Sequence, residues 1–81
     1  MNIRVKFYGG LHTRYPQLPL GQALACAVAE GMTVARLLHE VLALPPGAVG
    51  VLLVNGKVAE MTQTLAPEDQ VALFPPIAGG G

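Results

Sequence analysis

The 81-residue sequence contains no serine and only one cysteine, Cys26. A serine-type catalytic triad is therefore excluded, and a lone cysteine cannot form an internal disulfide, a CxxC pair or a thiolate cluster for zinc. This cysteine usage fits a reducing compartment, so we expect a cytoplasmic protein. Because Cys26 lies in an apolar segment, we expect a small core side chain rather than a reactive thiol.

Charged side chains are also scarce, because Asp, Glu, Lys and Arg make up 12% of the chain and the formal net charge is zero. The basic footprint of a nucleic-acid-binding protein is missing, so nucleic acid is not expected as the main partner. Arg4, Lys6 and Arg14 are interpreted either as an ordinary solvated surface or as a small basic patch for an acidic partner. The hydrophobic fraction of 52% indicates a folded core.

Long hydrophobic runs are missing as well. The uncharged stretches are interrupted by prolines and fall short of the roughly 20 apolar residues that cross a bilayer, so no membrane span is predicted. The first ten residues, MNIRVKFYGG, do not read as a signal peptide. A chain of this length supports one small domain, in which a deep catalytic cleft is not expected.

Several segments have the pattern of strands. Residues 2–8 alternate between apolar and polar side chains. In residues 22–30 larger side chains alternate with alanine, which we interpret as a second strand. Asn55-Gly56 between two apolar runs predicts a hairpin with a type I′ turn. Residues 71–74, VALF, are predicted to form the last strand.

One helix is predicted from Thr33 onward, because threonine can cap the first turn of a helix. The apolar residues that follow recur at helical spacing and predict a stripe that faces the core. This stripe consists of Val34, Leu37, Leu38, Val41 and Leu42. Residues 45–47, Pro-Pro-Gly, are predicted to end the helix, because proline lacks the amide donor.

The expected order is therefore strand, strand, helix, hairpin and final strand. One main helix packed across a mixed sheet of about five strands is an α+β arrangement. This order is that of a β-grasp, or ubiquitin-like, fold. We expect residues 1–76 to form the β-grasp domain and residues 77–81 to form a flexible C-terminal glycine tail.

Metal ligands and acid–base groups are few. His12 lies in a glycine-rich loop and His39 on the polar face of the predicted helix, and neither has a second ligand nearby in sequence. Both are interpreted as surface residues, and no metal site is predicted. Glu68 and Asp69 follow Pro67 and are interpreted as a solvated turn rather than an acid–base pair.

The chemistry is expected instead in the last segment, VALFPPIAGGG. Pro75 and Pro76 stop the strand and stiffen its exit, so that the tail projects from the domain. From Pro76 to Gly81 the chain can extend roughly 16–18 Å, enough to reach a site buried in another protein. Because glycines are narrow and leave the terminal carbonyl unobstructed, the reacting group is expected to be the Gly81 carboxylate.

Partner proteins are expected to contact the residues just before this carboxylate. Strand periodicity places Phe74 on the outer face of the sheet, either as a docking surface or as an aromatic that covers the sheet edge. The predicted partner-binding residues are Phe74, Pro75, Pro76, Ile77, Ala78, Gly79 and Gly80.

The ending FPPIAGG, together with GMTVARLL and LLVNGK, resembles the MoaD/ThiS family of ubiquitin-like sulfur-carrier proteins. It is most similar to the MoaD branch, the small subunits of molybdopterin synthase, because thiamine-pathway carriers generally lack the Pro-Pro pair. The resemblance spans nearly the whole chain. Its specific part is the FPPxAGG ending, whereas the other segments are common among β-grasp proteins.

This resemblance implies a carrier and not an enzyme, with no cofactor bound by the chain itself. An adenylating partner related to ubiquitin activators would use ATP and Mg²⁺ to convert the carboxylate to an acyl-adenylate. Sulfur would then displace AMP and form a thiocarboxylate. The large subunit of molybdopterin synthase would use that sulfur to build the dithiolene of molybdopterin, with two carriers on each large-subunit dimer.

This chain carries a third glycine, whereas the family typically stops at Gly-Gly. Either Gly81 is the activated residue, or it is trimmed and Gly80 becomes terminal. Other functions also remain open at this point. The sulfur acceptor could be thiamine, cysteine or tRNA, the glycine could be conjugated to lysine as in a ubiquitin-like modifier, or the chain could be an interaction module with an inert tail.

Overall fold

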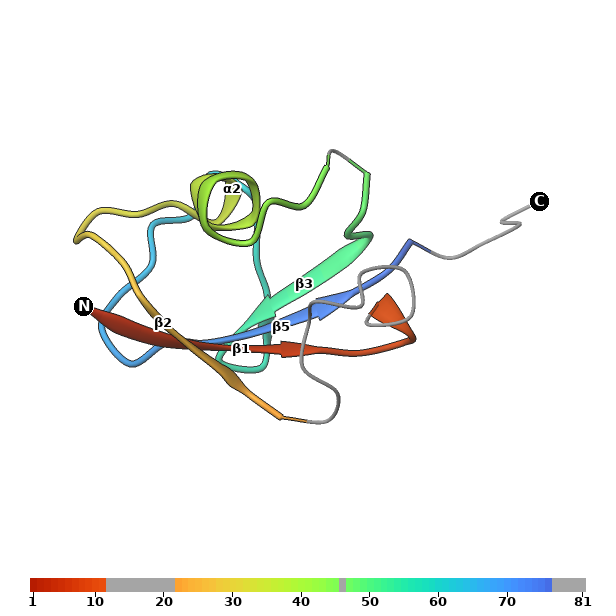
Figure 1. The fold of residues 1–81 in the computed structure, drawn as a ribbon, viewed down its shortest axis with the longest axis horizontal. Helices are drawn as coiled ribbons and strands as arrows, with labels where there is room; N and C mark the ends of the chain where they lie inside the picture. Colours follow the sequence, from red (N-terminus) through yellow and green to blue (C-terminus); the bar gives the residue numbers. More distant parts are fainter. Residues whose placement is uncertain (12–21, 46, 77–81) are drawn as a thin grey trace.

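The computed structural model describes residues 1–11, 22–45 and 47–76. Five strands in these ranges form one mixed sheet, and a helical segment crosses one of its faces (Figure 1). The strands are β1 (Asn2–Phe7), β2 (Leu24–Ala27), β3 (Val51–Val54), β4 (Lys57–Val58) and β5 (Gln70–Phe74). Their order in the sheet is β2-β1-β5-β3-β4. The predicted β-grasp fold is confirmed.

The last strand along the chain, β5, is the central strand of the sheet. It runs parallel to β1 on one side and antiparallel to β3 on the other. β1 and β2 pair antiparallel as a first hairpin, and β3 and β4 form the second hairpin. The turn of the second hairpin has positive φ at both Asn55 (53°) and Gly56 (81°), which confirms the predicted type I′ turn.

The core lies between the sheet and the helical segment. Alternate residues of β1 and β5 point toward the helix, because successive side chains of a strand face opposite sides of the sheet. Those that are buried on these strands are Ile3, Val5, Phe7, Val71 and Leu73. Cys26 is buried in the same core, as the sequence predicted, and burial raises the pKa of its thiol.

The helical segment begins as predicted at Thr33, whose side chain accepts a hydrogen bond from the Arg36 N–H at 3.3 Å. It consists of α2 (Val34–Arg36) and a directly following π-helical turn, η1 (Leu37–Val41). The first residue of α2 also bonds to a distant loop. The N–H of Val34 donates to the carbonyl of Gln63 at 3.0 Å. No helix in the described ranges is long and apolar enough to span a membrane.

The π-turn corrects the predicted apolar stripe. Val34, Leu37, Leu38 and Leu42 are buried as expected, but Val41 is 41% exposed. The Leu42 N–H donates to the Leu37 carbonyl, five residues earlier, at 3.0 Å. A π-helical turn contains more residues than the 3.6 of an α-helical turn. The side chains after it therefore point in other directions than α-helical spacing predicts. Leu42 rather than Val41 therefore faces the core.

The helical segment also ends earlier than predicted. η1 ends at Val41, and Ala43 adopts a left-handed φ of 54°, before the Pro-Pro-Gly run at 45–47. The Leu44 N–H then donates to the Leu38 carbonyl at 2.9 Å. This closure around a left-handed residue is one residue wider than the Schellman arrangement, whose bond joins residues five apart, and the extra residue belongs to the π-turn. Glycine is the usual residue at the left-handed position that Ala43 occupies. The backbone closure, and not the prolines, ends the helix.

Candidate functional site

Pro75 and Pro76 follow β5 directly and precede the predicted tail, and they are called the exit of β5 here. The Tyr8 N–H donates to the Leu73 carbonyl at 2.9 Å, and the Gly50 N–H donates to the Phe74 carbonyl at 2.8 Å. The strand is thus held by both of its neighbours up to its last residue. Pro75 and Pro76 follow, and proline has no amide hydrogen with which to continue a ladder. The sheet pairing of β5 therefore stops where the sequence predicted.

The predicted reacting residues, Gly81 or Gly80, lie outside the described residues, as do Ile77, Ala78 and Gly79. Of the predicted partner-binding residues, the structure describes Phe74, Pro75 and Pro76. Phe74 and Pro75 are half-buried and Pro76 is exposed.

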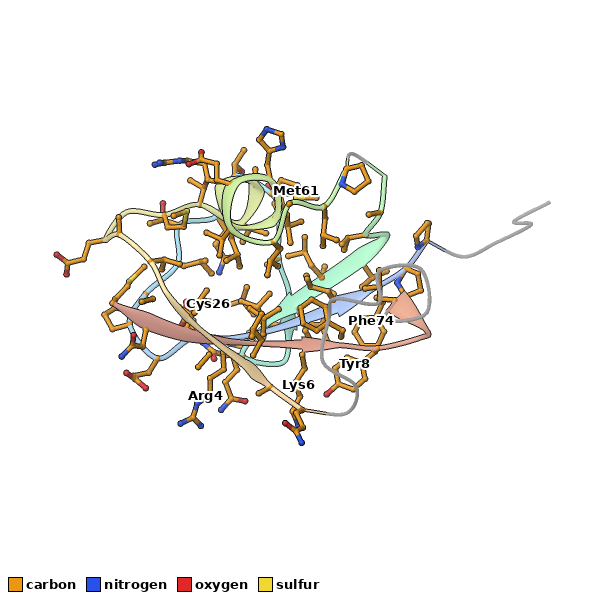
Figure 2. All side chains as sticks on the ribbon, viewed as in Figure 1. Arg4, Lys6, Tyr8, Cys26, Met61 and Phe74 are labelled. Atoms are coloured by element: carbon orange, nitrogen blue, oxygen red, sulfur yellow. The ribbon has the colours of Figure 1, made fainter. Side chains whose placement is uncertain are left out.

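Phe74 lies on the sheet face that the helix does not cover, which is called the open sheet face here. Its ring stacks on that of Tyr8, with 4.9 Å between the ring centroids and 13° between the planes. Figure 2 shows both rings on the side of the sheet opposite the helix. Because β5 is the central strand, Phe74 does not cover a sheet edge. The stack half-buries Phe74, whereas Tyr8 remains 40% exposed.

A shallow, mostly apolar hollow of about 520 Å³ lies beside the exit of β5. It is lined by Gly9, Val51, Leu53, Phe74, Pro75 and Pro76. Val51 is 41% exposed, although valine is usually found inside proteins. This end of the open sheet face therefore offers apolar side chains to another protein at the point where the chain leaves the domain.

A second hollow, of about 390 Å³, extends along the same sheet face and is more polar. Arg4 and Lys6 of β1 line it together with Gln70 of β5, and Figure 2 shows both cations pointing away from the helix. In the part of the chain that the structure describes, the salt bridge found is Arg36–Glu40, so neither Arg4 nor Lys6 is paired with a carboxylate there. Arg14, the third predicted member of the patch, lies outside the described residues.

Asp69 has a different role from the one predicted. It is 8% exposed, and its Oδ1 and Oδ2 accept hydrogen bonds at 2.8 Å from the Asn55 side-chain amide and the Ala66 N–H. The Asn55 Oδ1 in turn accepts from the Gln70 N–H at 2.9 Å. Glu68 is exposed, so the two acids do not form an acid–base pair. The interpretation of Asp69 as solvated was wrong, because it fastens the hairpin turn to the start of β5.

The remaining candidates do not converge on a site. His39 is exposed on η1, and His12 lies outside the described residues. Among the residues that the structure describes, no group of three His, Cys, Asp or Glu side chains is placed to hold a metal ion. The exit of β5 and the adjoining open sheet face are thus the candidate functional surface.

The model of the ThiS family matches residues 11–80. This chain belongs to the ThiS family. The match covers most of the chain and ends at Gly80, so it includes the Pro75–Pro76 exit and the predicted tail up to its penultimate residue. No curated protein matches the chain in sequence. The family consists of small ubiquitin-like carriers and modifiers that are generally not catalysts themselves.

Solved structures show the same fold. SAMP1 from Haloferax volcanii is 22% identical, with a TM-score of 0.73 over 99% of this chain and 100% of that chain. The Haloferax volcanii HVO 2177 protein is 23% identical, with a TM-score of 0.76 over 99% of this chain and 87% of that one. A putative molybdopterin converting factor, subunit 1, from Pyrococcus furiosus is 20% identical, with a TM-score of 0.69 over 94% and 98%. At these identities the likeness establishes the ubiquitin-like fold of this ThiS-family chain.

Proposed function

We propose that this ThiS-family protein carries sulfur for the synthesis of molybdopterin. The reacting group is the carboxylate of Gly81, or of Gly80 if the last glycine is trimmed. The observation that best supports the proposal is the exit of β5, a central strand bonded on both sides up to Phe74 that passes directly into Pro75 and Pro76. Thiamine-pathway carriers generally lack this proline pair. The similarity to a putative molybdopterin converting factor subunit adds support.

The chemistry follows from the weakness of a carboxylate as an electrophile. An adenylating partner joins the carboxylate to the AMP part of ATP and releases pyrophosphate, with Mg²⁺ acting in that partner. A sulfur nucleophile then attacks the activated carbonyl, so that a carbon–sulfur bond forms and AMP leaves. The product is a thiocarboxylate, a soft nucleophile at neutral pH. This chain is the substrate and carrier of these steps, and the catalysts are its partners.

The second partner is the large subunit of molybdopterin synthase, which uses the thiocarboxylate to build the dithiolene. Because a dithiolene needs two sulfur atoms, two carriers act on each large-subunit dimer. We propose that both partners bind the open sheet face next to the exit, through the Tyr8–Phe74 stack and the apolar hollow beside it. Arg4 and Lys6 provide the positive charge for an acidic segment on a partner.

A second candidate function is protein modification. The structural similarity to SAMP1, described as a small archaeal modifier protein, favours it. In that case the amine of a lysine attacks the carbonyl of the same acyl-adenylate, so that AMP leaves and an isopeptide bond forms in place of the thiocarboxylate. A third candidate function is the transfer of sulfur to thiamine or another acceptor, which uses the same chemistry at the tail. The three functions share the activated glycine and differ in the acceptor.

The first experiment is intact mass spectrometry of the protein isolated from its own cells, with alkylation to trap a thioacid. One terminal oxygen replaced by sulfur would support the carrier, and the mass would also identify Gly81 or Gly80 as the terminal residue. The purified chain is then incubated with ATP, Mg²⁺, a sulfur donor and the cognate adenylating enzyme. The control lacks Gly80 and Gly81. An intact chain that stays unloaded under these conditions would contradict the carrier function.

The acceptor is identified in two parallel assays. The thiocarboxylate form is mixed with the large subunit and the molybdopterin precursor, and formation of molybdopterin is measured. Cell extracts are searched by peptide mass spectrometry for lysines linked to the glycine tail. Molybdopterin without lysine adducts supports the proposed function, whereas lysine adducts without molybdopterin favour the modifier.

A further inference from the structure

Two glycines lie against the two prolines at the exit. Gly9 follows β1, and Gly50 directly precedes β3, so they approach β5 from its two neighbouring strands. A Cβ added at Gly9 would lie 2.7 Å from Cδ of Pro75, and one added at Gly50 would lie 2.4 Å from Cα of Pro76. Both distances are below the 3.0 Å that real Cβ contacts respect. Neither position accepts a larger residue unless the chain at the exit moves.

The need for glycine at position 50 comes from this contact and not from its backbone conformation. Gly50 does not have the positive φ that favours glycine, and its N–H is fixed by the hydrogen bond to the Phe74 carbonyl. By contrast, a Cβ at Gly47 or Gly56 would meet nothing within 4 Å, although both have positive φ. The tight fit at Gly50 is therefore specific to the exit.

We infer that Gly9 and Gly50 are positioning residues for the activation of the tail. They form a slot around Pro75 and Pro76, called the exit slot here, that sets where and in which direction the chain leaves the domain. The inference rests on the proposed function. The candidate functional surface and the exit slot lie at the same end of β5. When the tail is fully extended in the partner it has no slack, so the slot and the number of tail residues together set the reach from the docked domain to the carbonyl.

Such a reach matters because group transfer requires the reacting atoms to be about 3–3.5 Å apart, and a displacement of about 1 Å can cost roughly 100-fold in rate. A methyl group at position 50 would meet the backbone of Pro76, which cannot turn away as a flexible side chain would. The chain at the exit must then move by a distance similar to the displacement of about 1 Å that slows group transfer. The Tyr8–Phe74 stack precedes the displaced residue and is expected to keep its place, whereas Pro76, which lines the apolar hollow, moves with the exit.

The test compares Gly50→Ala with the parent chain in loading by ATP, Mg²⁺, sulfide and the cognate adenylating enzyme. Pyrophosphate release and the mass of the thiocarboxylate are measured. We expect kcat for Gly50→Ala to fall by about 10- to 100-fold and KM to rise by a smaller factor, because only the Pro76 edge of the hollow moves. Gly47→Ala is the control for a general loss of stability: it adds the same methyl group in a nearby turn without touching the exit, its φ of 85° strains an alanine there, and it should nevertheless load at the parent rate.

A double-mutant cycle separates positioning from a general loss of stability. Gly9→Ala should slow loading, because its methyl group meets the Pro75 ring. It also carries strain from the φ of 65° at position 9, which is the same with or without that ring. Pro75→Ala removes Cγ and Cδ, the atoms that the methyl group would meet. Adding Gly9→Ala to Pro75→Ala should therefore slow loading far less than adding it to the parent.

The outcomes separate this inference from the proposed function. If the parent chain loads and Gly50→Ala loads at the same kcat, the positioning role is refuted and the carrier function stands. An equal fall in kcat for Gly47→Ala, measured on the folded variant, would likewise refute it, because a methyl group far from the slot would then have the same effect. If the parent chain itself cannot be loaded, the carrier function fails, and the positioning role fails with it.

Discussion

Ala43 offers a test of the helix end, because a single change there is expected to stabilise the protein. Its φ of 54° places an alanine in the left-handed region at the end of the helical segment. That conformation costs a non-glycine residue about 1–2 kcal/mol. Glycine removes this strain but loses about 0.4–1 kcal/mol more backbone entropy on folding. The Ala43→Gly variant should therefore gain about 0–1.6 kcal/mol in unfolding free energy, with a central value of about 0.8 kcal/mol and a Tm roughly 3–6 °C higher.

Urea unfolding followed by far-ultraviolet circular dichroism measures this difference at an unchanged m-value. Ala35→Gly is the matched control, since it makes the same substitution at an exposed position of α2. There glycine should lower the unfolding free energy by about 1 kcal/mol. Opposite signs for the two variants are the expected result. A loss of stability for Ala43→Gly as large as that for Ala35→Gly would refute the proposed helix end.

Three further predictions address the core, the turn network and the tail. Leu37→Ala should cost about 2–5 kcal/mol of unfolding free energy because Leu37 is fully buried, whereas Val41→Ala should cost less than about 1 kcal/mol. Equal losses in urea unfolding would mean that Val41 faces the core, as regular α-helical spacing predicts. Asp69→Ala should cost about 1–3 kcal/mol by leaving the Asn55 amide and the Ala66 N–H without their acceptor, and a parent-like thermal midpoint would contradict the hydrogen bonds described. Gly81→Ala should leave the Tm unchanged but slow sulfur loading in the mass assay, and normal loading would count against the need for a narrow tail.

The sequence was sufficient for the fold because its strongest signals are local. Strict alternation in β1, the Thr33 cap and the Asn55-Gly56 turn each specify their own segment, and the structure confirms all three. The helix register was partly wrong because counting residues at 3.6 per turn assumes an uninterrupted α-helix. No local pattern in the sequence identified the π-turn.

The parts of the site that sequence reasoning missed are contacts between distant residues. Tyr8 and Phe74 are far apart in sequence and stack only because β1 and β5 are parallel neighbours. The local sequence predicts a solvated turn at Asp69, because the partner that buries its carboxylate, Asn55, lies 14 residues away. The Pro-Pro pair was visible in the sequence, but Gly9 and Gly50, which enclose it, lie beside the ends of two other strands.

The placement of β5 also has a consequence for when the protein can act. During synthesis β1–β2 and β3–β4 can form as two separate hairpins, but β1 and β3 have no common neighbour until residues 70–74 have left the ribosome. Joining the halves requires contacts between distant segments, which form late and slowly. The exit exists only in the completed sheet, because Tyr8 and Gly50 must both bond to β5. A partner that recognises this exit would therefore bind molecules whose sheet is complete. The strand order would in this way exclude incompletely folded chains from activation.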